Sequence, residues 1–302
     1  MFIDSYICSD CPRGCAVERS PDKPGGFCSS PSLPVIARAA PHFGEEPCIS
    51  GVRGSGAIFF SSCNLRCVFC QNRDISRSSR GKELTVQQLA DIIRSLEDRG
   101  VHNINLVTGT HFTRAIASAL ELAKPKIPVL WNSSGYELPE TLKMLDGLVN
   151  IYMPDYKYSD GNLAKRLSAA GDYPLRAAEA IAEMFRQRGE YKIGEDRMLQ
   201  SGVLIRHLIL PGYTDNTMDA IDFVADSFPA GSVLFSLMSQ YTPMPGPELP
   251  GELGRTVSAG ESDAMGHYMR LRGLNGYTQD ISSAGTEMIP LFDIVAPDEN
   301  LL

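Results

Sequence analysis

The strongest constraint on the fold of this chain is a regular alternation of apolar, strand-like runs and amphipathic, helix-like segments that begins at residue 56. The expected strands cover residues 56–62, 103–109, 127–132, 149–155, 203–210 and 232–238. The expected helices cover residues 86–99, 113–124, 138–147, about 160–170, 174–188, about 215–227 and 261–272. Because the strands are apolar on both faces, the pattern predicts a parallel sheet buried beneath helices.

The predicted fold class is therefore α/β, and two architectures fit the pattern. Six strand–helix units are fewer than a closed eight-fold barrel needs, so a partial TIM-type barrel and an open doubly wound sheet are both compatible with the sequence. In either architecture, ligands bind at the carboxyl ends of the strands. Side chains that directly follow the strands are the first candidates for a functional site.

Residues 1–55 differ from residues 56–302 in composition and in hydrophobic pattern, and we expect them to form a separate, irregular, cysteine-rich segment. Residues 1–56 contain seven prolines and seven glycines and show no sustained helical or alternating pattern. All eight cysteines of the chain lie between positions 8 and 70. Disulfides of a secreted protein would more naturally be spread through the fold, so this concentration of thiols favours metal binding in a reducing compartment.

Composition argues against several kinds of partner. Acidic residues outnumber basic ones by 36 to 28, which gives a formal charge of −8, and no block of lysine and arginine occurs. This balance disfavours binding to nucleic acid. The start, MFIDSYICSDC, lacks the basic and apolar segments of a signal peptide, and no apolar run is long enough to cross a membrane. We therefore expect a cytoplasmic protein without membrane contact.

Three thiols follow the first expected strand in the stretch SCNLRCVFCQNRD, at Cys63, Cys67 and Cys70. Thiolates are soft ligands that suit zinc or iron–sulfur clusters. A closed zinc site needs four ligands, so Cys48 or a histidine would have to complete it. A cubane iron–sulfur cluster held by three cysteines instead leaves one iron open to a non-protein ligand. The thiols could also be small core hydrophobes, but their spacing favours the open-site cluster.

The stretch CNLRCVFCQNRD resembles the C-x3-C-x2-C signature of the radical S-adenosylmethionine (SAM) enzymes, with an aromatic residue before the last cysteine. It is most similar to the version in glycyl-radical enzyme activases, in the branch of pyruvate formate-lyase activating enzyme-like iron–sulfur proteins. The stretch PHFGEEPCISG and the cysteine-rich N-terminus also resemble that branch.

This resemblance implies a partial (β/α)6 barrel over residues 56–302 and a 4Fe–4S cluster whose open iron binds SAM. It also implies reductive cleavage of SAM to methionine and a 5'-deoxyadenosyl radical. The electron would come from a flavodoxin- or ferredoxin-type reductant.

The resemblance further implies which residues contact SAM. Phe69 would line the adenine pocket, and Asp155 and Lys157 match an Asp-x-Lys signature for SAM or a nearby cation. Without the resemblance, that pair would more often be an exposed salt bridge. Ser133 and Ser134 could meet the sugar or carboxylate of SAM, although serines before a glycine are usually turn residues.

The fifth expected strand, VLIRHLIL, carries Arg206 and His207 in an otherwise apolar run. An unpaired charge is costly to bury, so an anionic group should meet Arg206. The resemblance implies that this group belongs to SAM; the alternative is a structural ion pair with an acid such as Asp155. His207 would point to the opposite face, where we expect a core histidine with satisfied hydrogen bonds.

One stretch departs from the family pattern. Family members usually carry Gly-Gly-Glu after the second strand to hold the amino group of methionine, whereas this chain has VTGTHF. Thr108 and Gly109 remain as expected SAM contacts, but Thr110 and His111 replace the second glycine and the glutamate. The amino group must then use another acceptor, such as a backbone carbonyl or Thr110. This departure weakens a transfer of activase chemistry more than it weakens SAM binding.

The N-terminal cysteines predict a second metal site. Cys8, Cys11, Cys15 and Cys28 supply four thiols framed by turn-forming glycines and prolines, which suits a closed centre that is structural or transfers electrons. Zinc and an auxiliary iron–sulfur cluster both fit, because the spacing matches neither a zinc ribbon nor a bacterial ferredoxin. The alternative is a set of free thiols in a loose segment. Cys48 is left over, either buried and inert or a spare ligand.

Three functions remain compatible with the sequence. The first is activation of a glycyl-radical enzyme by abstraction of hydrogen from a backbone glycine. The second is radical modification of a small molecule or of another peptide or protein. The third, of a different class, is a non-enzymatic zinc protein that uses its cysteines for partner binding. The proline- and glycine-rich segment 242–254 is a candidate rim or lid of the site, or an ordinary solvated loop.

Overall fold

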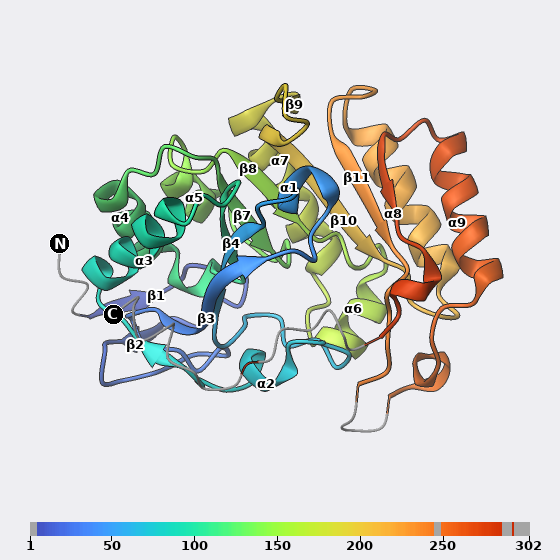
Figure 1. Ribbon diagram of the computed structural model, residues 1–302. Helices are drawn as coiled ribbons and strands as arrows, with labels where there is room; N and C mark the ends of the chain where they lie inside the picture. Colours follow the sequence, from blue (N-terminus) through green and yellow to red (C-terminus); the bar gives the residue numbers. More distant parts are fainter. Residues whose placement is uncertain (1–4, 245–248, 286–291, 293–302) are drawn as a thin grey trace.

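A computed structural model describes residues 5–244, 249–285 and 292 (Figure 1). The strands are β1 (Tyr6–Cys8), β2 (Val17–Arg19), β3 (Val35–His42), β4 (Ser55–Phe60), β5 (Lys82–Glu83), β6 (Ile104–Val107), β7 (Val129–Ser133), β8 (Ile151–Pro154), β9 (Lys192–Ile193), β10 (Leu199–Leu208), β11 (Leu234–Met238) and β12 (Gly276–Thr278). The α-helices are α1 (Pro47–Ser50), α2 (Arg73–Ser76), α3 (Val86–Asp98), α4 (Thr113–Ala123), α5 (Pro139–Leu142), α6 (Gly161–Ser168), α7 (Tyr173–Arg188), α8 (Thr214–Ser227) and α9 (Ala259–Leu271).

The main sheet has the spatial order β12-β11-β10-β8-β7-β6-β4-β3-β5, and β9 pairs with β10. The six predicted strands β4, β6, β7, β8, β10 and β11 are neighbours in chain order and run parallel. Successive crossovers of the same hand place their helices on one face of such a sheet, whereas a doubly wound sheet reverses its order. The α/β class is confirmed, and the sequential order decides for the partial barrel. Within the described residues this strand path stays open.

Helices cover the outer side of the curved sheet, with α3 and α4 towards one edge and α8 and α9 towards the other (Figure 1). Helix α3 shows why the sequence specifies these elements. Thr85 accepts a hydrogen bond from the backbone N–H of Gln88, and the Gln88 side chain accepts one from Thr85, which forms a capping box. The apolar positions of α3 recur at helical spacing and are buried, so its inner face packs on the sheet and on α4.

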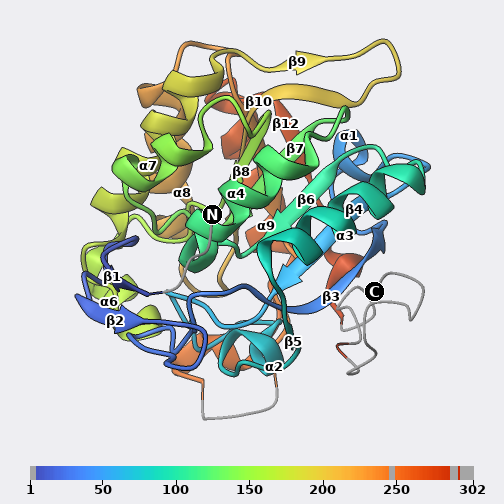
Figure 2. The same cartoon turned by 90° about the vertical axis from the view of Figure 1, so that its left-hand side faces the viewer.

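The loops at the carboxyl ends of the parallel strands gather at one end of the molecule. Figures 1 and 2 both show β1, β2, α2 and α6 at this end, beneath the sheet. Helix α2 follows β4 and α6 follows β8, while β1 and β2 belong to the N-terminal segment. The cysteine-rich N-terminus therefore lies at the end of the barrel where ligands are expected.

Several parts of the fold were not anticipated, including the short strands β1, β2, β5, β9 and β12. Strand β3 lies within the segment predicted to be irregular, yet it pairs antiparallel with β4 and extends the main sheet. Its apolar run is short and lies between Pro34 and Pro41, which hides the pattern. The predicted helix 138–147 is only one turn, α5, followed by a 3-10 turn. The boundary between residues 55 and 56 stays a prediction.

Two further expectations concern a lid and a membrane. Residues 245–248 of the candidate lid 242–254 lie outside the described residues, while Tyr241 Oη donates a hydrogen bond to the Leu253 carbonyl, 2.8 Å away, at the end of this segment. Of the helices in the described ranges, none combines the length and the apolar character needed to cross a bilayer.

Candidate active site

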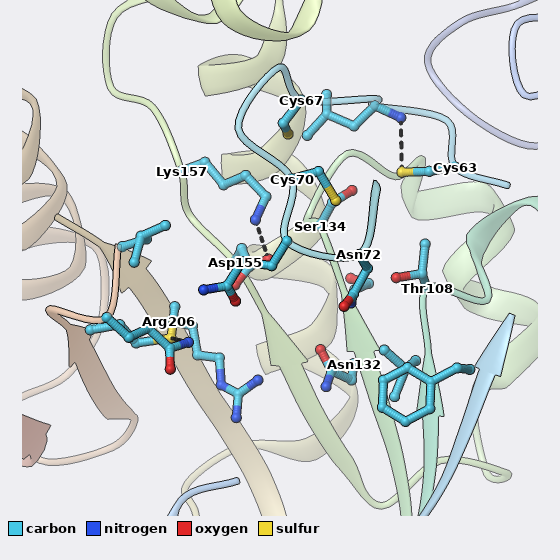
Figure 3. Close-up of a pocket in the computed structure, with 18 of the residues that line it drawn as sticks. Cys63, Cys67, Cys70, Asn72, Thr108, Asn132, Ser134, Asp155, Lys157 and Arg206 are labelled. Carbon is cyan, nitrogen blue, oxygen red and sulfur yellow. Dashed lines mark hydrogen bonds and ion pairs between the residues drawn. The ribbon is translucent and has the colours of Figure 1, made fainter. Parts of the chain in front are cut away.

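A cavity of about 230 Å³ lies at the carboxyl ends of the parallel strands. It brings together most of the residues that the sequence singled out: Cys63, Cys67, Phe69 and Cys70 after β4, Thr108 after β6, Ser133 and Ser134 at the end of β7, Asp155 and Lys157 after β8, and Arg206 on β10. Figure 3 shows the three cysteines together on one side of this cavity, with Lys157 and Asp155 beside them and Asn132 and Arg206 farther from the cysteines.

The loop after β4 curls its three thiols towards the cavity. Ser62 and Arg66 adopt positive φ angles of 69° and 57°, and the Ser62 backbone N–H donates to the Ile75 carbonyl at 2.7 Å, which closes the loop over α2. Cys63 and Cys67 are buried and Cys70 is half-buried, and all three thiols are free. The backbone N–H of Leu65 points at the Cys63 Sγ atom from 3.3 Å.

The protonation of Cys63 and the arrangement of the three thiols limit what this loop can bind. Burial raises the pKa of Cys63 to about 12, so this thiol stays protonated unless a cation replaces the proton. Across the described ranges, no group of three or more His, Cys, Asp or Glu side chains is arranged to hold a single metal ion. A cubane cluster takes one thiolate on each iron, so three cysteines around it do not converge on one atom.

Lys157 supplies a positive charge beside these thiols. Its Nζ atom lies 2.5 Å from Asp155 Oδ2, and both side chains are only 18% exposed, so the pair is not the solvated salt bridge of the simplest interpretation. Burial lowers the pKa of Lys157, but Asp155, Cys67 and Cys70 together outweigh burial and raise it. Lys157 is therefore a permanent cation at the wall of the cavity.

Ser134 has an unused hydroxyl at the same wall. Its Oγ atom is buried and has no hydrogen-bond partner in the structure, which is costly unless a ligand supplies one. Tyr173 holds the neighbouring backbone in place: its Oη atom lies 2.8 Å from the carbonyl oxygens of Ser134 and Asp155 and accepts a hydrogen bond from the Lys157 N–H. The ends of β7 and β8 are thus joined where a ligand would contact both.

The hydroxyl of Ser133 forms a hydrogen bond with a buried carboxylate, Glu137, that the sequence pattern did not single out. This hydroxyl donates to Glu137 Oε2 at 2.6 Å, while Trp131 Nε1 and Thr110 Oγ1 donate to Glu137 Oε1 at 2.8 and 3.0 Å. Burial raises the pKa of Glu137, and these three hydrogen bonds oppose that effect. Thr110, an expected acceptor for the amino group of SAM, therefore serves Glu137. The only sequence signal was a glutamate just after the WNSSG turn.

Arg206 finds its anionic partners within the protein. Its Nε atom donates to Glu46 Oε1 at 2.8 Å, and its Nη2 atom contacts carboxylate oxygens of both Glu45 and Glu46. Asp155, the acid suggested by the sequence, is not the partner, although its backbone pairs with that of Arg206. Glu45 lines the cavity, and Asn105 Nδ2 also donates to it at 2.8 Å. Sequence reasoning named neither glutamate as a partner because both precede the barrel.

The remaining predicted residues divide into cavity residues and packing residues. Phe69 lines the cavity, with its ring edge-on to Tyr158 and Tyr241 at centroid distances of 6.4 and 6.0 Å. Thr108 also lines it and has an unusual positive φ of 61°. Gly109 instead faces the interior, where an added Cβ atom would lie 2.7 Å from Ile116 and 3.0 Å from Trp131.

His207 has the structural role that was expected. It is fully buried, with Nδ1 2.6 Å from the Tyr156 carbonyl and Nε2 3.0 Å from Thr217 Oγ1. Burial lowers the pKa of His207 to about 4, so the ring is neutral at physiological pH. It faces away from the cavity and contributes to the core beneath α8.

The four N-terminal cysteines line a second, much smaller cavity. Cys8, Cys11, Cys15 and Cys28 surround about 10 Å³ together with Arg19 and Asn64. Gly14 and Gly26 adopt positive φ angles of 52° and 76° in the turns between them, where other residues would be strained. Cys48 is not part of this site: it is buried in a hydrophobic cluster with Ile49, Leu130 and Ile151.

Comparison with known proteins agrees with this geometry. The model of the Radical SAM superfamily matches residues 57–224, and the chain belongs to that superfamily. An uncharacterized protein of Methanocaldococcus jannaschii is 30% identical over 246 residues, which cover 78% of this chain and 66% of that protein. The chain thus spans about two thirds of the length of this relative.

The solved structure of methylornithine synthase shows a similar fold at low sequence identity. Methylornithine synthase (PylB) is 15% identical with a TM-score of 0.50, covering 74% of this chain and 70% of that protein. SuiB of Streptococcus suis, in a structure bound to S-adenosylmethionine, is 15% identical with a TM-score of 0.49, covering 73% of this chain and 48% of SuiB. Membership of this superfamily implies a 4Fe–4S cluster and SAM as cofactors.

Proposed function

We propose that Cys63, Cys67 and Cys70 hold the 4Fe–4S cluster and that the chain uses it to cleave SAM and abstract a hydrogen atom from a substrate. The observation that carries this proposal is the gathering of three free thiols at a cavity whose wall also carries a paired Lys157 and an unpaired Ser134 hydroxyl. When bound, the cluster and SAM supply the electron and the 5'-deoxyadenosyl radical.

The chain's own residues have distinct roles in this proposal. Lys157 offsets the negative charge of the thiolates, and Asp155 fixes its ammonium group. Ser134 offers its free hydroxyl to the sugar or carboxylate of SAM, and Thr108 lines the same wall. Phe69 supplies an aromatic face for the adenine.

Three residues support the cavity wall in this proposal without contacting SAM: Ser133, Gly109 and Arg206. Ser133 is anchored by Glu137, Gly109 lets β6 approach Trp131, and Arg206 orients Glu45 at the cavity wall. Glu45 and Asn132 are the polar groups at the far side of the cavity from the thiols. These two side chains contact each other, with Asn132 Nδ2 3.4 Å from Glu45 Oε1.

We infer that the substrate is a segment of a protein, with the backbone glycine of a glycyl-radical enzyme as the first candidate. The cavity of about 230 Å³ is below the roughly 300 Å³ at which pockets for drug-sized ligands begin, so it offers little space for a bulky substrate beside the cofactors. A narrow chain segment that reaches in from the surface needs little further room. The likeness of CNLRCVFCQNRD to the activase motif supports the glycine as target. A small-molecule substrate is the alternative.

Anaerobic reconstitution with iron and sulfide tests the cluster and the chemistry. The reconstituted protein should bind about four irons at this loop and release 5'-deoxyadenosine from SAM when a reductant is added. The triple variant Cys63→Ala, Cys67→Ala, Cys70→Ala should release none, whereas Cys48→Ala, which removes a buried thiol elsewhere, should retain activity. Uptake of zinc alone, with no 5'-deoxyadenosine, would instead favour a non-enzymatic zinc protein.

A second assay tests the substrate. A glycyl-radical enzyme encoded near this chain's gene should acquire the electron paramagnetic resonance doublet of a glycyl radical when mixed with the reconstituted protein, SAM and a flavodoxin- or ferredoxin-type reductant. If SAM is cleaved but no protein radical forms, the activase proposal fails and the small-molecule or other peptide substrate takes its place.

We also propose that Cys8, Cys11, Cys15 and Cys28 hold a second metal centre. An auxiliary iron–sulfur cluster, with one thiolate on each iron, needs less rearrangement than zinc, which would need the thiols to move towards one atom. Support comes from their shared small cavity and from a buried cation beside them. Arg19 is 0% exposed, and its Nη1 atom lies 3.5 Å from Cys8 Sγ. A thiolate centre carries negative charge, which stabilises such a buried guanidinium.

A further inference from the structure

The turn between Cys11 and Cys15 holds the loop that carries the three cavity cysteines. Arg13 Nε donates to the Asn64 carbonyl at 2.8 Å, and Arg13 Nη2 lies 3.3 Å from the Leu65 carbonyl. The same guanidinium donates to the carbonyl of Ser168 at 2.8 Å and to that of Ala169, at the end of α6. One side chain of the N-terminal segment therefore joins the loop after β4 to the segment after β8.

The loop that carries the cavity cysteines also donates hydrogen bonds to the N-terminal segment. Arg66, which lies between Cys63 and Cys67, donates through Nη2 to the Cys28 carbonyl at 3.1 Å and to Ser29 Oγ at 3.2 Å. The guanidinium groups of Arg13 and Arg66 both lie over the Phe27 ring, at 3.7 and 5.2 Å from its centroid. Phe27 directly precedes Cys28, so a change at the four-cysteine site would move this contact.

Arg19 shows that the four-cysteine site is built for negative charge. Its Nε atom donates to the Ser30 carbonyl at 2.9 Å and its Nη1 atom to the His111 carbonyl at 2.9 Å, which ties the N-terminal segment to the barrel after β6. In the part of the chain that the structure describes, no carboxylate forms a salt bridge with this buried guanidinium. Thiolates bound to a metal supply the charge that a buried cation needs.

We propose that the N-terminal metal centre acts as a clamp that sets the position of the loop bearing Cys63, Cys67 and Cys70, through Arg13, Arg66 and Phe27. This inference rests on the second metal centre proposed above. The physical reason is that the described residues 5–34 contain only two three-residue strands and little apolar surface of their own, so cross-linking by a metal is what would hold Arg13 and Phe27 in place. Arg13 and Phe27 are positioning residues and would not touch the cofactors.

The existence of the N-terminal centre is tested first, in the variant that lacks Cys63, Cys67 and Cys70. Elemental analysis and Mössbauer spectroscopy of this variant should find either one zinc or a complete iron–sulfur cluster per chain. Further replacement of Cys11 and Cys15 by alanine should abolish that metal. A variant without any bound metal at this stage would overturn the clamp, while the wild-type protein could still cleave SAM.

The clamp itself is tested with Arg13→Gln, which removes contacts to the loop and leaves every cysteine in place. This variant should keep the N-terminal metal, bind SAM at least about fivefold more weakly, and alter the electron paramagnetic resonance spectrum of the reduced cavity cluster. Amide hydrogen exchange across residues 62–78 should become faster. Arg94→Gln, which changes an exposed ion pair with Asp91 on α3, is the matched control and should leave all three readouts unchanged.

Two results would overturn the clamp without touching the proposed function. In the first, Arg13→Gln binds SAM within twofold of the wild-type protein and gives the same spectrum. In the second, Phe27→Leu, which keeps a half-buried apolar side chain but removes the aromatic face, behaves like the wild-type protein in both measurements. The wild-type protein assayed in parallel for 5'-deoxyadenosine shows whether the radical SAM chemistry itself holds.

Discussion

Arg206 on β10 forms a two-pronged ion pair with Glu46, which lies 160 residues earlier in the chain, and Nε and Oε1 are 2.8 Å apart. Arg206 also contacts Glu45, and the three side chains are between 7% and 12% exposed. The pair joins the segment before β4 to the far half of the sheet. Burial lowers the pKa of Arg206, but Glu45 and Glu46 outweigh it and raise that pKa, so the cation persists at all relevant pH values.

Replacing Arg206 by glutamine should destabilise the protein by about 3–5 kcal/mol, because it leaves two buried carboxylates without a counter-charge. Urea unfolding followed by circular dichroism measures this loss. Arg94→Gln, at a pair with Asp91 in which the two side chains are 40% and 54% exposed, should cost less than about 1 kcal/mol. Equal losses in the two variants would contradict the assignment of Arg206 to a buried ion pair.

Replacing Arg206, Glu45 and Glu46 together by glutamine should recover much of that stability, because neutral side chains leave no unpaired charge. The triple variant then separates stability from binding. If its affinity for SAM stays near that of the wild-type protein, none of these charges contacts SAM. A loss of SAM affinity of more than about tenfold would instead indicate that Arg206 or Glu45 contacts SAM.

The two neighbouring serines should respond differently to replacement by alanine. Ser134→Ala should leave stability within about 0.5 kcal/mol of the wild-type value, because the hydroxyl has no partner to lose, while SAM binding weakens by about tenfold. Ser133→Ala should lower the free energy of unfolding by about 1–3 kcal/mol, because Glu137 loses a buried donor. Isothermal titration and urea unfolding give the two quantities. The reverse pattern would assign the SAM contact to Ser133.

His207 should make stability depend on pH. Its folded-state pKa of about 4 lies below the value of about 6.5 for an unfolded histidine. Its contribution is therefore complete above pH 6.5 and is lost as the pH falls through about 4, because only the unfolded chain takes up the proton. Between pH 7 and pH 5 the wild-type protein should lose about 2 kcal/mol from this group. His207→Gln should lack this part of the slope, and an unchanged slope would contradict the prediction.

Two glycines provide a matched test of the geometry at the cavity. Gly135 has a φ of +74°, and an added Cβ atom would lie 2.3 Å from the Asp155 carbonyl oxygen. Gly147 has a similar φ of +84°, but nothing lies within 4 Å of its added Cβ atom. Gly147→Ala should cost about 1 kcal/mol from backbone strain alone. Gly135→Ala should cost at least about 2 kcal/mol more and weaken SAM binding, because β7 and β8 must separate. Similar losses at the two positions would show that Asp155 is not fixed there.

Local features of the chain were predictable from the sequence. The alternation of strands and helices, the Thr85 cap of α3 and the loop thiols after β4 all depend on residues a few positions apart. The carboxyl ends of parallel strands share one edge, so Phe69, Ser134, Asp155 and Lys157 could be placed in one cavity without coordinates. Hydrophobic periodicity and capping carry this information because they act within one element.

Partners that come from different elements were not predictable. Local pattern does not contain the pairing of Arg206 with Glu46, the position of Glu137 beneath Thr110, or the contact of Arg13 with Asn64. Strand β3 was missed for a related reason, since its pairing with β4 is what makes it a strand. The sequence by itself determined the parallel α/β architecture, the cluster motif and the family resemblance. Only the tertiary structure decided which charges compensate each other and which segment holds the cysteine loop. Those contacts form between residues that are far apart in the sequence and meet only when the sheet and the N-terminal segment have packed together.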